Sequence, residues 1–261
     1  MVIFQIMRKI KLLIEYDGTA CQGWQIQKDG LTVQGILEDR IRKITGEHSR
    51  VTGAGRTDAG VHALGQVATF RTEGELDPET IKKALNAVLP QDIRILDASE
   101  TVSSFNPRDD AVRKSYFYII VNQRISSAFL YRYSWIVQQQ LELNSMIEAS
   151  QVLIGRHDFS SFMGTGSSIK DPVREIFSFD IDKLEKIDFM TASLRNNFIK
   201  IRIEANGFLR HMVRNIVGTL VEIGRGRIPA SRMKEILASC DRRLAGPTAP
   251  AQGLFLERIE Y

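Results

Sequence analysis

Apolar residues in the first hundred positions recur at two spacings, which predict strands and helices. In Lys9–Tyr16 every second residue is apolar, the period of a half-buried strand. Val33–Ile44 repeats apolar residues at helical spacing. A second helix opens at Asp77-Pro78, a pair typical of a helix start, and stops before Pro90. The predicted order is a strand at 9–16, a helix at 33–44, strands at 50–52 and 65–71, a helix at 78–89 and a strand at 93–98.

The remaining sequence repeats this plan with insertions. The predicted elements are strands at 115–121, 133–137 and 173–181, a helix at 144–154, a hairpin joining 189–194 to 198–205 through Arg195-Asn196-Asn197, helices at 209–223 and 231–238, and a strand at 254–261. Two successive α+β halves with hairpin-linked strands indicate antiparallel sheets covered on one face by helices. We place the boundary near Asn106–Arg108, which gives domains of residues 1–107 and 108–261.

Composition narrows the class of protein. The chain has 261 residues, of which 43% are hydrophobic, enough for a sizeable core. No apolar stretch approaches the roughly 20 residues that a membrane-spanning helix needs. Met1–Met7 is too short for a secretory signal, so we expect a cytoplasmic protein. Cys21 and Cys240 lie in different halves and the four histidines stand far apart, so no metal-ligand spacing is present. The net charge of +4 suits a polyanionic partner without identifying one.

The segment Gly53–His62, GAGRTDAGVH, combines three glycines with an arginine and a carboxylate. A dinucleotide-binding fingerprint would require glycine where Asp58 stands, and an acid there would repel a pyrophosphate. A phosphate-binding P-loop is excluded because no Gly-Lys-Ser/Thr follows. The glycines therefore indicate a tight loop that holds one carboxylate as a nucleophile or base. The alternative is that Asp58 only caps a turn and pairs with Arg56 on the surface.

The longer string from Gly53 to Gln66, GAGRTDAGVHALGQ, strongly resembles the signature of the TruA family of tRNA pseudouridine synthases. Other resemblances follow in the family's order and span nearly the whole chain. They are EYDG at 15–18, GWQ at 23–25, SYFY at 115–118, HMVRNIVG at 211–218 and GLFL at 253–256.

The resemblance implies a role for five residues. Asp58 matches the catalytic aspartate, and Arg214 matches the arginine that pairs with it. Tyr116 matches the tyrosine that stacks on the target base. Leu254 falls in the segment that lines the uracil pocket, and Arg56 contacts the RNA or helps to hold the flipped nucleotide. From the residues alone, Tyr116 could equally pack in the core, and Arg214 could be a surface arginine.

Pseudouridine formation breaks the bond from ribose C1′ to uracil N1 and joins C1′ to C5, without net oxidation or hydrolysis. One carboxylate suffices, whether it attacks C1′, attacks C6 or removes a ribose proton, and the sequence leaves these three open. An enzyme that acts on a base must extrude it, and an aromatic ring can stack on the flipped base. Basic residues supply affinity for the RNA backbone, and the candidates on strands are Lys9, Lys11, Arg113, Lys114, Lys200 and Arg202.

The resemblance also implies a fold and a substrate. The fold is that of the pseudouridine synthases: two ferredoxin-like α+β halves that form a continuous, mainly antiparallel sheet, with helices on one face and a central active-site cleft. The protein is expected to be a homodimer, to need no metal or organic cofactor, and to act on uridines 38, 39 and 40 in the anticodon arm of tRNA.

Two other classes of function remain open. One is an RNA-binding protein or RNA chaperone without catalysis, although the joint presence of Asp58, Tyr116 and Arg214 argues against it. The other is a hydrolase that uses Asp58 to cut a nucleoside glycosidic bond, which would release free uracil. Two-carboxylate glycosidase chemistry would need a second acid, and none stands at a recognisable spacing.

Overall fold

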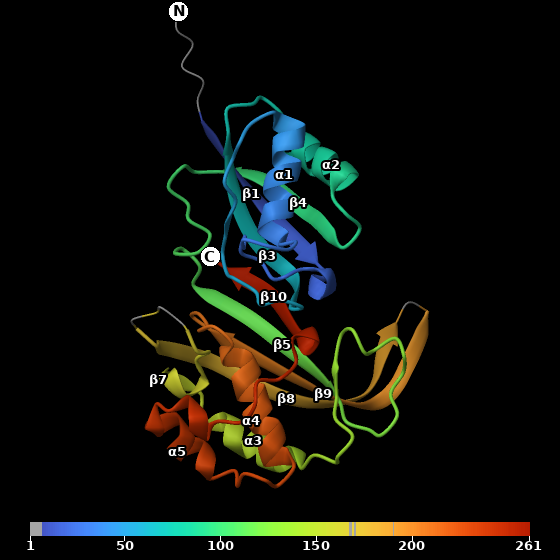
Figure 1. Ribbon diagram of the computed structural model, residues 1–261, viewed down its shortest axis with the longest axis vertical. Coiled ribbons are helices and arrows are strands. Elements are labelled where there is room, and N and C mark those ends of the chain that lie inside the picture. Colours follow the sequence, from blue (N-terminus) through green and yellow to red (C-terminus); the bar gives the residue numbers. More distant parts are fainter. Residues whose placement is uncertain (1–6, 167–168, 170, 190) are drawn as a thin grey trace, which may run out of the picture. The chain divides into compact units, whose positions relative to one another are not determined.

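The computed structural model describes residues 7–166, 169, 171–189 and 191–261 (Figure 1). Most of Met1–Met7 and part of the loop that follows Met163 therefore lie outside the described residues. The chain forms two compact units. Unit 1 contains the residues up to Val112 together with Leu256–Tyr261, and unit 2 contains Arg113–Phe255.

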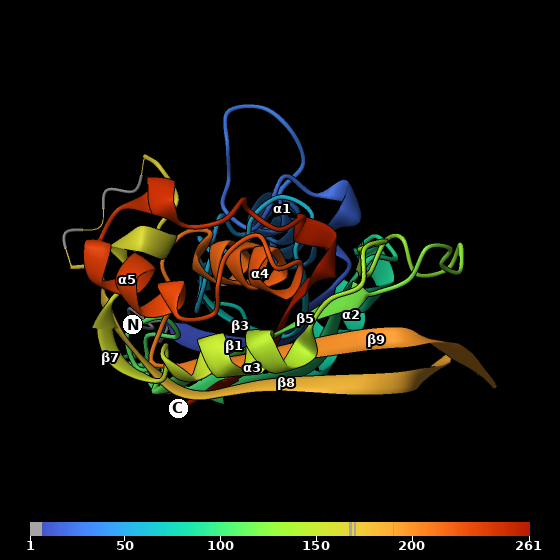
Figure 2. The same cartoon turned by 90° about the horizontal axis from the view of Figure 1, so that it is seen from below.

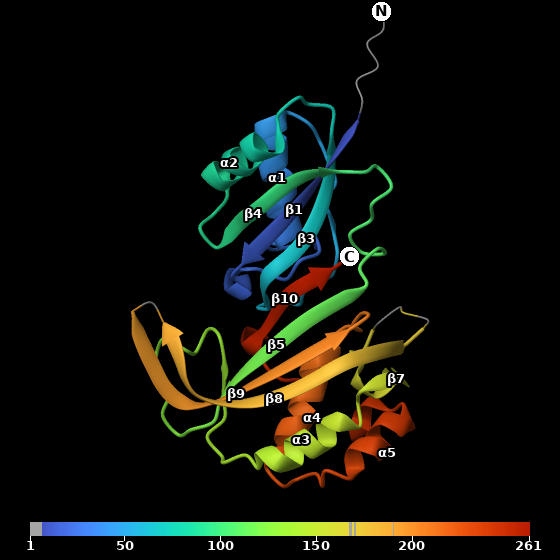
Figure 3. The same ribbon diagram turned by 180° about the vertical axis from the view of Figure 1, so that it is seen from behind.

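Unit 1 is an antiparallel sheet with two helices on one face. Its strands run in the order β4-β1-β3, and the short β2 pairs with β3. Figure 1 shows α1 and α2 in front of these strands, and Figure 3 shows the other face of the sheet. The elements are β1 (Arg8–Tyr16), α1 (Val33–Thr45), β2 (Thr52–Gly53), β3 (His62–Thr72), α2 (Pro78–Val88) and β4 (Ile93–Thr101).

The helices of unit 1 begin and end where the sequence predicts. The Thr32 hydroxyl accepts a hydrogen bond from the Gly35 N–H and caps α1. Gly46, at φ 78°, ends the helix in the left-handed conformation that glycine adopts without strain. Asp77 caps α2 through the Thr80 N–H, and Pro78 occupies the first turn. Fully buried apolar residues of β1, α1 and α2 form the core: Ile10, Leu12, Ile14, Leu37, Ile41, Ile81 and Leu85.

Unit 2 has the same type of architecture with a longer hairpin. Its strands run in the order β5-β9-β8-β7, all antiparallel, and β6 pairs with β5 in parallel. Figure 2 shows α3 and α4 on one side of the β8–β9 hairpin. The elements are β5 (Arg113–Val121), β6 (Trp135–Ile136), α3 (Leu143–Gln151), β7 (Gly155–Asp158), β8 (Val173–Phe189), β9 (Ala192–Ala205), α4 (Met212–Gly224) and α5 (Arg232–Ser239). The last strand, β10 (Leu254–Glu260), begins in unit 2 and continues into unit 1.

The fold class is confirmed as α+β with mainly antiparallel strands, but some boundaries differ from the prediction. The turn predicted at Arg195–Asn197 is wrong, because β9 begins at Ala192 and Ala192 pairs with Phe189. Backbone pairing in the hairpin therefore overrides the local turn preference of Asn-Asn. The strand β7 was not predicted. Helix α4 starts later than expected, because His211 adopts a left-handed conformation with φ 61°.

Candidate active site

The loop that carries Asp58 rests on Trp24. The Trp24 N–H donates to the carbonyl oxygen of Thr57 (3.0 Å). A Cβ on Gly53 would lie 2.5 Å from the Trp24 ring, so only glycine lets the loop start this close to the indole. The Trp24 side chain is buried. One buried ring and one backbone bond thus fix the segment on the N-terminal side of Asp58.

Thr57, directly before Asp58, is held from two sides. Its hydroxyl is 2.8 Å from the Tyr16 hydroxyl at the end of β1. Burial raises the pKa of Tyr16 far above its usual range, against the lowering effect of hydrogen bonds with Thr57 and Gln66, so the phenol stays protonated. Gly23, at φ 90°, approaches so closely that a Cβ there would lie 2.6 Å from the Thr57 carbonyl oxygen. Thr57 is therefore buried and fixed.

The chain leaves Asp58 through a second tight turn. The Val61 N–H donates to the Asp58 carbonyl oxygen (3.1 Å), and Gly60 has φ 77°. Nδ1 of His62 lies 3.1 Å from the Gly18 nitrogen and 3.1 Å from the Asp17 carboxylate, which places this ring beside the end of the turn. Asp58 itself is partly exposed. The loop thus presents one carboxylate to solvent between two anchored neighbours, the arrangement expected of a nucleophile or base.

Cys21 lies beside this loop, because its carbonyl oxygen accepts a hydrogen bond from the Gly60 N–H (3.3 Å). Its thiol is a second potential nucleophile. Burial raises the pKa of the Cys21 thiol to about 11, and the charges of Asp92 and Asp17 act in the same direction. Because only the thiolate is a strong nucleophile, Cys21 is inert at neutral pH. Asp58 is the other potential nucleophile of this region, and its catalytic role stays a prediction.

Arg56 is exposed and forms no ion pair among the described residues. The alternative in which Arg56 pairs with Asp58 on the surface is therefore wrong. Arg56 is an exposed residue of the loop that carries Asp58, and its contact with RNA stays a prediction.

Arg214 lies in the first turn of α4 and is bound to the segment that leads to β10. Its Nε donates to the carbonyl oxygen of Ala249 (2.7 Å), and its own carbonyl oxygen accepts from the Ala249 N–H (3.0 Å). The side chain is partly buried. The reading of Arg214 as an ordinary surface arginine is therefore wrong, because the guanidinium is oriented by a hydrogen bond at Nε.

Tyr118 fixes the next carbonyl of the same segment. Its hydroxyl donates to the Pro250 carbonyl oxygen (2.7 Å), and a Cβ on Gly253 would lie 2.5 Å from its ring. Burial raises the pKa of Tyr118 far above its usual range, although the Arg214 charge lowers it, so the hydroxyl remains a donor. Leu254 follows this segment and is buried. Arg214 and Tyr118 thus bind the adjacent carbonyl groups of Ala249 and Pro250, and these bonds hold the segment that leads to Leu254.

Replacing Tyr118 with Phe is expected to cost about 1 kcal/mol of unfolding free energy, because the part-buried Pro250 carbonyl loses its donor. We also expect kcat to fall several-fold, since the same segment orients Arg214. Chemical denaturation and single-turnover kinetics would measure these two effects. Unchanged values of both would show that the hydroxyl does not hold the segment.

Tyr116 is on β5, where it pairs with Ile203 of β9. Its ring meets the Phe208 ring edge-on, with centroids 5.1 Å apart, and only 8% of the residue is exposed. The core-packing interpretation accounts for most of the ring, and stacking on a base stays a prediction. Asp58 and Arg56 belong to unit 1, whereas Tyr116, Arg214 and Leu254 belong to unit 2, and the pairing of Arg214 with Asp58 also stays a prediction.

Sequence reasoning missed the residues that support the site. The motif GWQ at 23–25 was noted only as a resemblance, yet Trp24 supports the loop that carries Asp58. Tyr118 was noted only within the SYFY resemblance at 115–118, yet its hydroxyl holds Pro250. No group of three or more His, Cys, Asp or Glu residues suited to a metal ion occurs in the described part of the chain. No helix in this part has the length and hydropathy needed to cross a membrane.

Known proteins similar to this chain identify its class. The family model described as tRNA pseudouridine synthase matches residues 12–108 and 149–261. A tRNA pseudouridine synthase A from Thermodesulfovibrio yellowstonii is 44% identical over 255 residues, covering 98% of this chain and 100% of the relative. A protein of the same name from Thermoanaerobacter sp. is 45% identical with the same coverage. The fold and the Asp58 loop thus define an isomerase of the pseudouridine-synthase class. The chain belongs to the tRNA pseudouridine synthase family.

Proposed function

We propose that this protein isomerises uridine to pseudouridine at positions 38, 39 and 40 in the anticodon arm of tRNA, with Asp58 as the catalytic residue. The observation that carries the proposal is the anchored loop, which presents a single carboxylate between the buried Thr57 and the turn at Gly60. The family membership of the chain supports the same reaction.

The proposed reaction uses side chains alone. The carboxylate of Asp58 attacks the nucleotide or removes a ribose proton, the bond from C1′ to N1 breaks, and C5 of the freed uracil bonds to C1′. The hydrogen lost from C5 is balanced by one gained at N1, so no oxidant or water is consumed. Arg214 keeps the aspartate ionised and oriented. Tyr116 stacks on the flipped base, Leu254 lines the uracil pocket and Arg56 contacts the RNA.

The proposal is tested by incubating the protein with unmodified tRNA and mapping pseudouridine at single-nucleotide resolution. We expect product at one or more of positions 38, 39 and 40 and no free uracil. Release of free uracil would instead indicate the hydrolase alternative. Tight binding of tRNA without any product would indicate an RNA-binding protein.

We further propose the organisation that the family resemblance implies. The N-terminal half, residues 1–107, carries the aspartate loop, and the C-terminal half, residues 108–261, carries the tyrosine strand and the arginine helix. The protein acts in the cytoplasm as a homodimer, which light scattering would detect as a particle of twice the chain mass of 29.5 kDa.

A further inference from the structure

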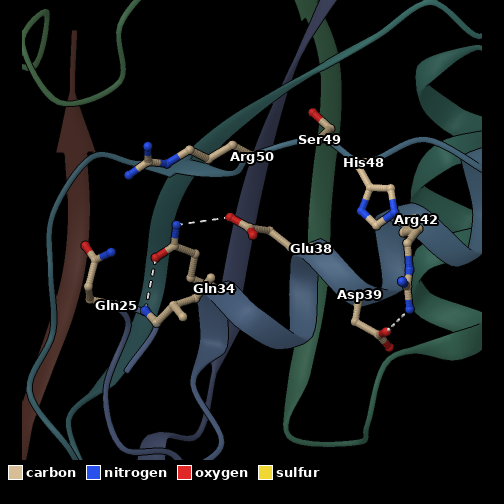
Figure 4. A pocket seen from close by; sticks show the side chains of 9 residues that line it. Gln25, Gln34, Glu38, Asp39, Arg42, His48, Ser49 and Arg50 are labelled. Carbon is tan, nitrogen blue, oxygen red and sulfur yellow. Dashed lines mark hydrogen bonds and ion pairs between the residues drawn. The ribbon is translucent and has the colours of Figure 1, made fainter. Parts of the chain in front are cut away.

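Unit 1 contains an open groove next to α1 (Figure 4), with a volume of about 690 Å³. One wall is α1, from Gln34 to Arg42, and the other is the segment between α1 and β2. Polar and charged side chains dominate the lining, which consists of Gln25, Ile26, Gln34, Glu38, Asp39, Arg42, His48, Ser49 and Arg50. A groove of this character suits a polar ligand rather than an apolar one.

The wall formed by residues 47–51 is anchored at every second residue. Three hydrogen bonds hold this segment against α1 and β3, and Ser49 also lines the groove. The anchoring bonds join Glu47 to the Thr72 hydroxyl (3.0 Å), the Ser49 hydroxyl to the Arg71 N–H (3.0 Å) and the Val51 N–H to Glu38 (3.0 Å).

The two alternate residues, His48 and Arg50, are exposed and line the groove. Neither side chain has a hydrogen-bond or ion-pair partner among the described residues. Figure 4 draws Arg50 and Gln25 at the left of the groove and His48 at the right. Gln25 likewise has no side-chain partner in this part of the chain. The groove therefore presents one permanent positive charge and two further polar groups that the fold does not use.

The acidic residues of the groove are already occupied. Glu38 accepts from the Gln34 amide (3.1 Å) in addition to the Val51 N–H, and Figure 4 shows the first of these bonds. Asp39 pairs with Arg42 (3.2 Å) and with the neighbouring arginine at position 40 (3.0 Å). Asp39 is therefore neutralised by two arginines, whereas Glu38 keeps its negative charge because both of its donors are neutral. Arg50 has no ion-pair partner among the described residues and can bind a ligand.

The basic residues that the sequence suggested for RNA binding are mostly engaged within the protein. Lys9 donates to the Phe105 carbonyl (2.5 Å), the Lys11 and Lys200 ammonium groups lie over phenylalanine rings, and Arg113 and Arg202 pair with Glu204 (3.0 and 2.9 Å). Arg50 differs from them because nothing in the described structure neutralises it. It is the better candidate for an external anion.

The groove is linked to the catalytic loop through Trp24. The Gln34 N–H donates to the Trp24 carbonyl oxygen (3.0 Å), while the Trp24 N–H donates to Thr57, next to Asp58. Gln25 follows Trp24 directly, and Arg50 stands three residues before Gly53. One buried residue therefore supports both the groove and the loop of the proposed nucleophile.

We propose that this groove binds a backbone phosphate of the tRNA substrate through Arg50, with Gln25 and His48 as further hydrogen-bonding groups. The inference rests on the proposed function, since it assumes tRNA as the ligand. The guanidinium of arginine matches the geometry of a phosphate with two parallel N–H donors. A contact of this kind positions the RNA and contributes affinity independently of base sequence.

The test is Arg50→Ala, assayed with unmodified tRNA. We expect Kd and KM to rise about 3-fold to 10-fold while kcat stays within about two-fold, and the slope of log Kd against log salt to fall by about 1. Arg50→Lys should recover part of the affinity because it keeps the charge. Lys83→Ala, which removes one exposed charge from α2 outside the groove, should leave the slope unchanged.

Identical Kd and salt slope in Arg50→Ala, Lys83→Ala and the unsubstituted protein would overturn the phosphate site. This outcome is separable from failure of the proposed function. If the unsubstituted protein forms pseudouridine but Arg50→Ala binds tRNA normally, only the groove assignment fails. If no pseudouridine forms while Arg50→Ala still weakens tRNA binding and lowers the salt slope, the groove assignment holds and the enzymatic proposal fails. Arg50→Glu gives a second check, because charge reversal should weaken binding further.

Discussion

Asp58→Asn is expected to reduce pseudouridine formation by at least about a thousand-fold while tRNA binding stays within a few-fold of normal. The amide has nearly the same shape as the carboxylate, so the bonds that fix Thr57 and Gly60 around it should persist. It cannot serve as a nucleophile or base in any of the three possible routes. Single-turnover assays with pseudouridine mapping would measure the loss, and filter binding would measure the affinity.

Two further measurements make the Asp58 result specific. Thr57→Ser keeps the hydroxyl that contacts Tyr16 and should retain most of the activity, so it serves as a neighbouring control. The melting temperature of Asp58→Asn should stay close to that of the unsubstituted protein, because the side chain is partly exposed. Turnover by Asp58→Asn near the normal rate would remove this residue from the mechanism.

Gly218→Ala is expected to lower the unfolding free energy by about 3 kcal/mol or more, or to prevent folding of unit 2. A Cβ at this position of α4 would lie 1.7 Å from the Pro247 carbonyl oxygen and 3.2 Å from the Ala249 nitrogen. Both contacts are with backbone, so no side-chain rotation relieves them. Because Ala249 accepts the Arg214 bond, any folded fraction should also have a reduced kcat.

Urea denaturation of Gly218→Ala would measure the loss of stability, with Gly207→Ala as the matched control. At Gly207 the new Cβ would meet only the Arg174 side chain at 3.6 Å, an ordinary contact, and the change should cost less than about 1 kcal/mol. Equal stability of the two variants would show that the backbone around Pro247 can shift to accommodate the new methyl group. The close approach of this segment to α4 would then not hold Arg214 in place.

Much of the fold could be predicted because local signals agree with tertiary packing. The caps at Thr32 and Asp77 define the starts of α1 and α2, and Gly46 defines an end. The position of the hairpin turn could not be predicted. Arg195-Asn196-Asn197 is a strong turn sequence, but the hydrogen bonds between β8 and β9 place it within strand β9. The start of α4 depends on a left-handed His211, a conformation that non-glycine residues adopt rarely.

The Asp58 loop could be selected as a candidate site because its residues are contiguous, whereas the residues that support it could not be identified from the sequence. Asp58 stands inside a recognisable string, but the bond from Trp24 to Thr57 joins residues 33 positions apart, and no periodicity in the sequence reveals it. Sequence reasoning also did not select Arg50 as a candidate for RNA binding, because its surroundings depend on residues that are distant in the sequence. The segment that carries Arg50 is held by the bond between Ser49 and Arg71, which exists only after β3 has formed.

The membership of β10 in both units has a consequence for biosynthesis. The last residues complete unit 1, because the Glu260 carbonyl accepts from the Val112 N–H (2.9 Å) and the Tyr261 ring packs against Phe105 (4.9 Å). Translation proceeds from the N-terminus, and domains generally fold as they emerge. Although most of unit 1 leaves the ribosome first, it stays unfinished until residues 256–261 have been translated. A nascent chain stalled before Leu256 would therefore expose the strand edge that these residues cover.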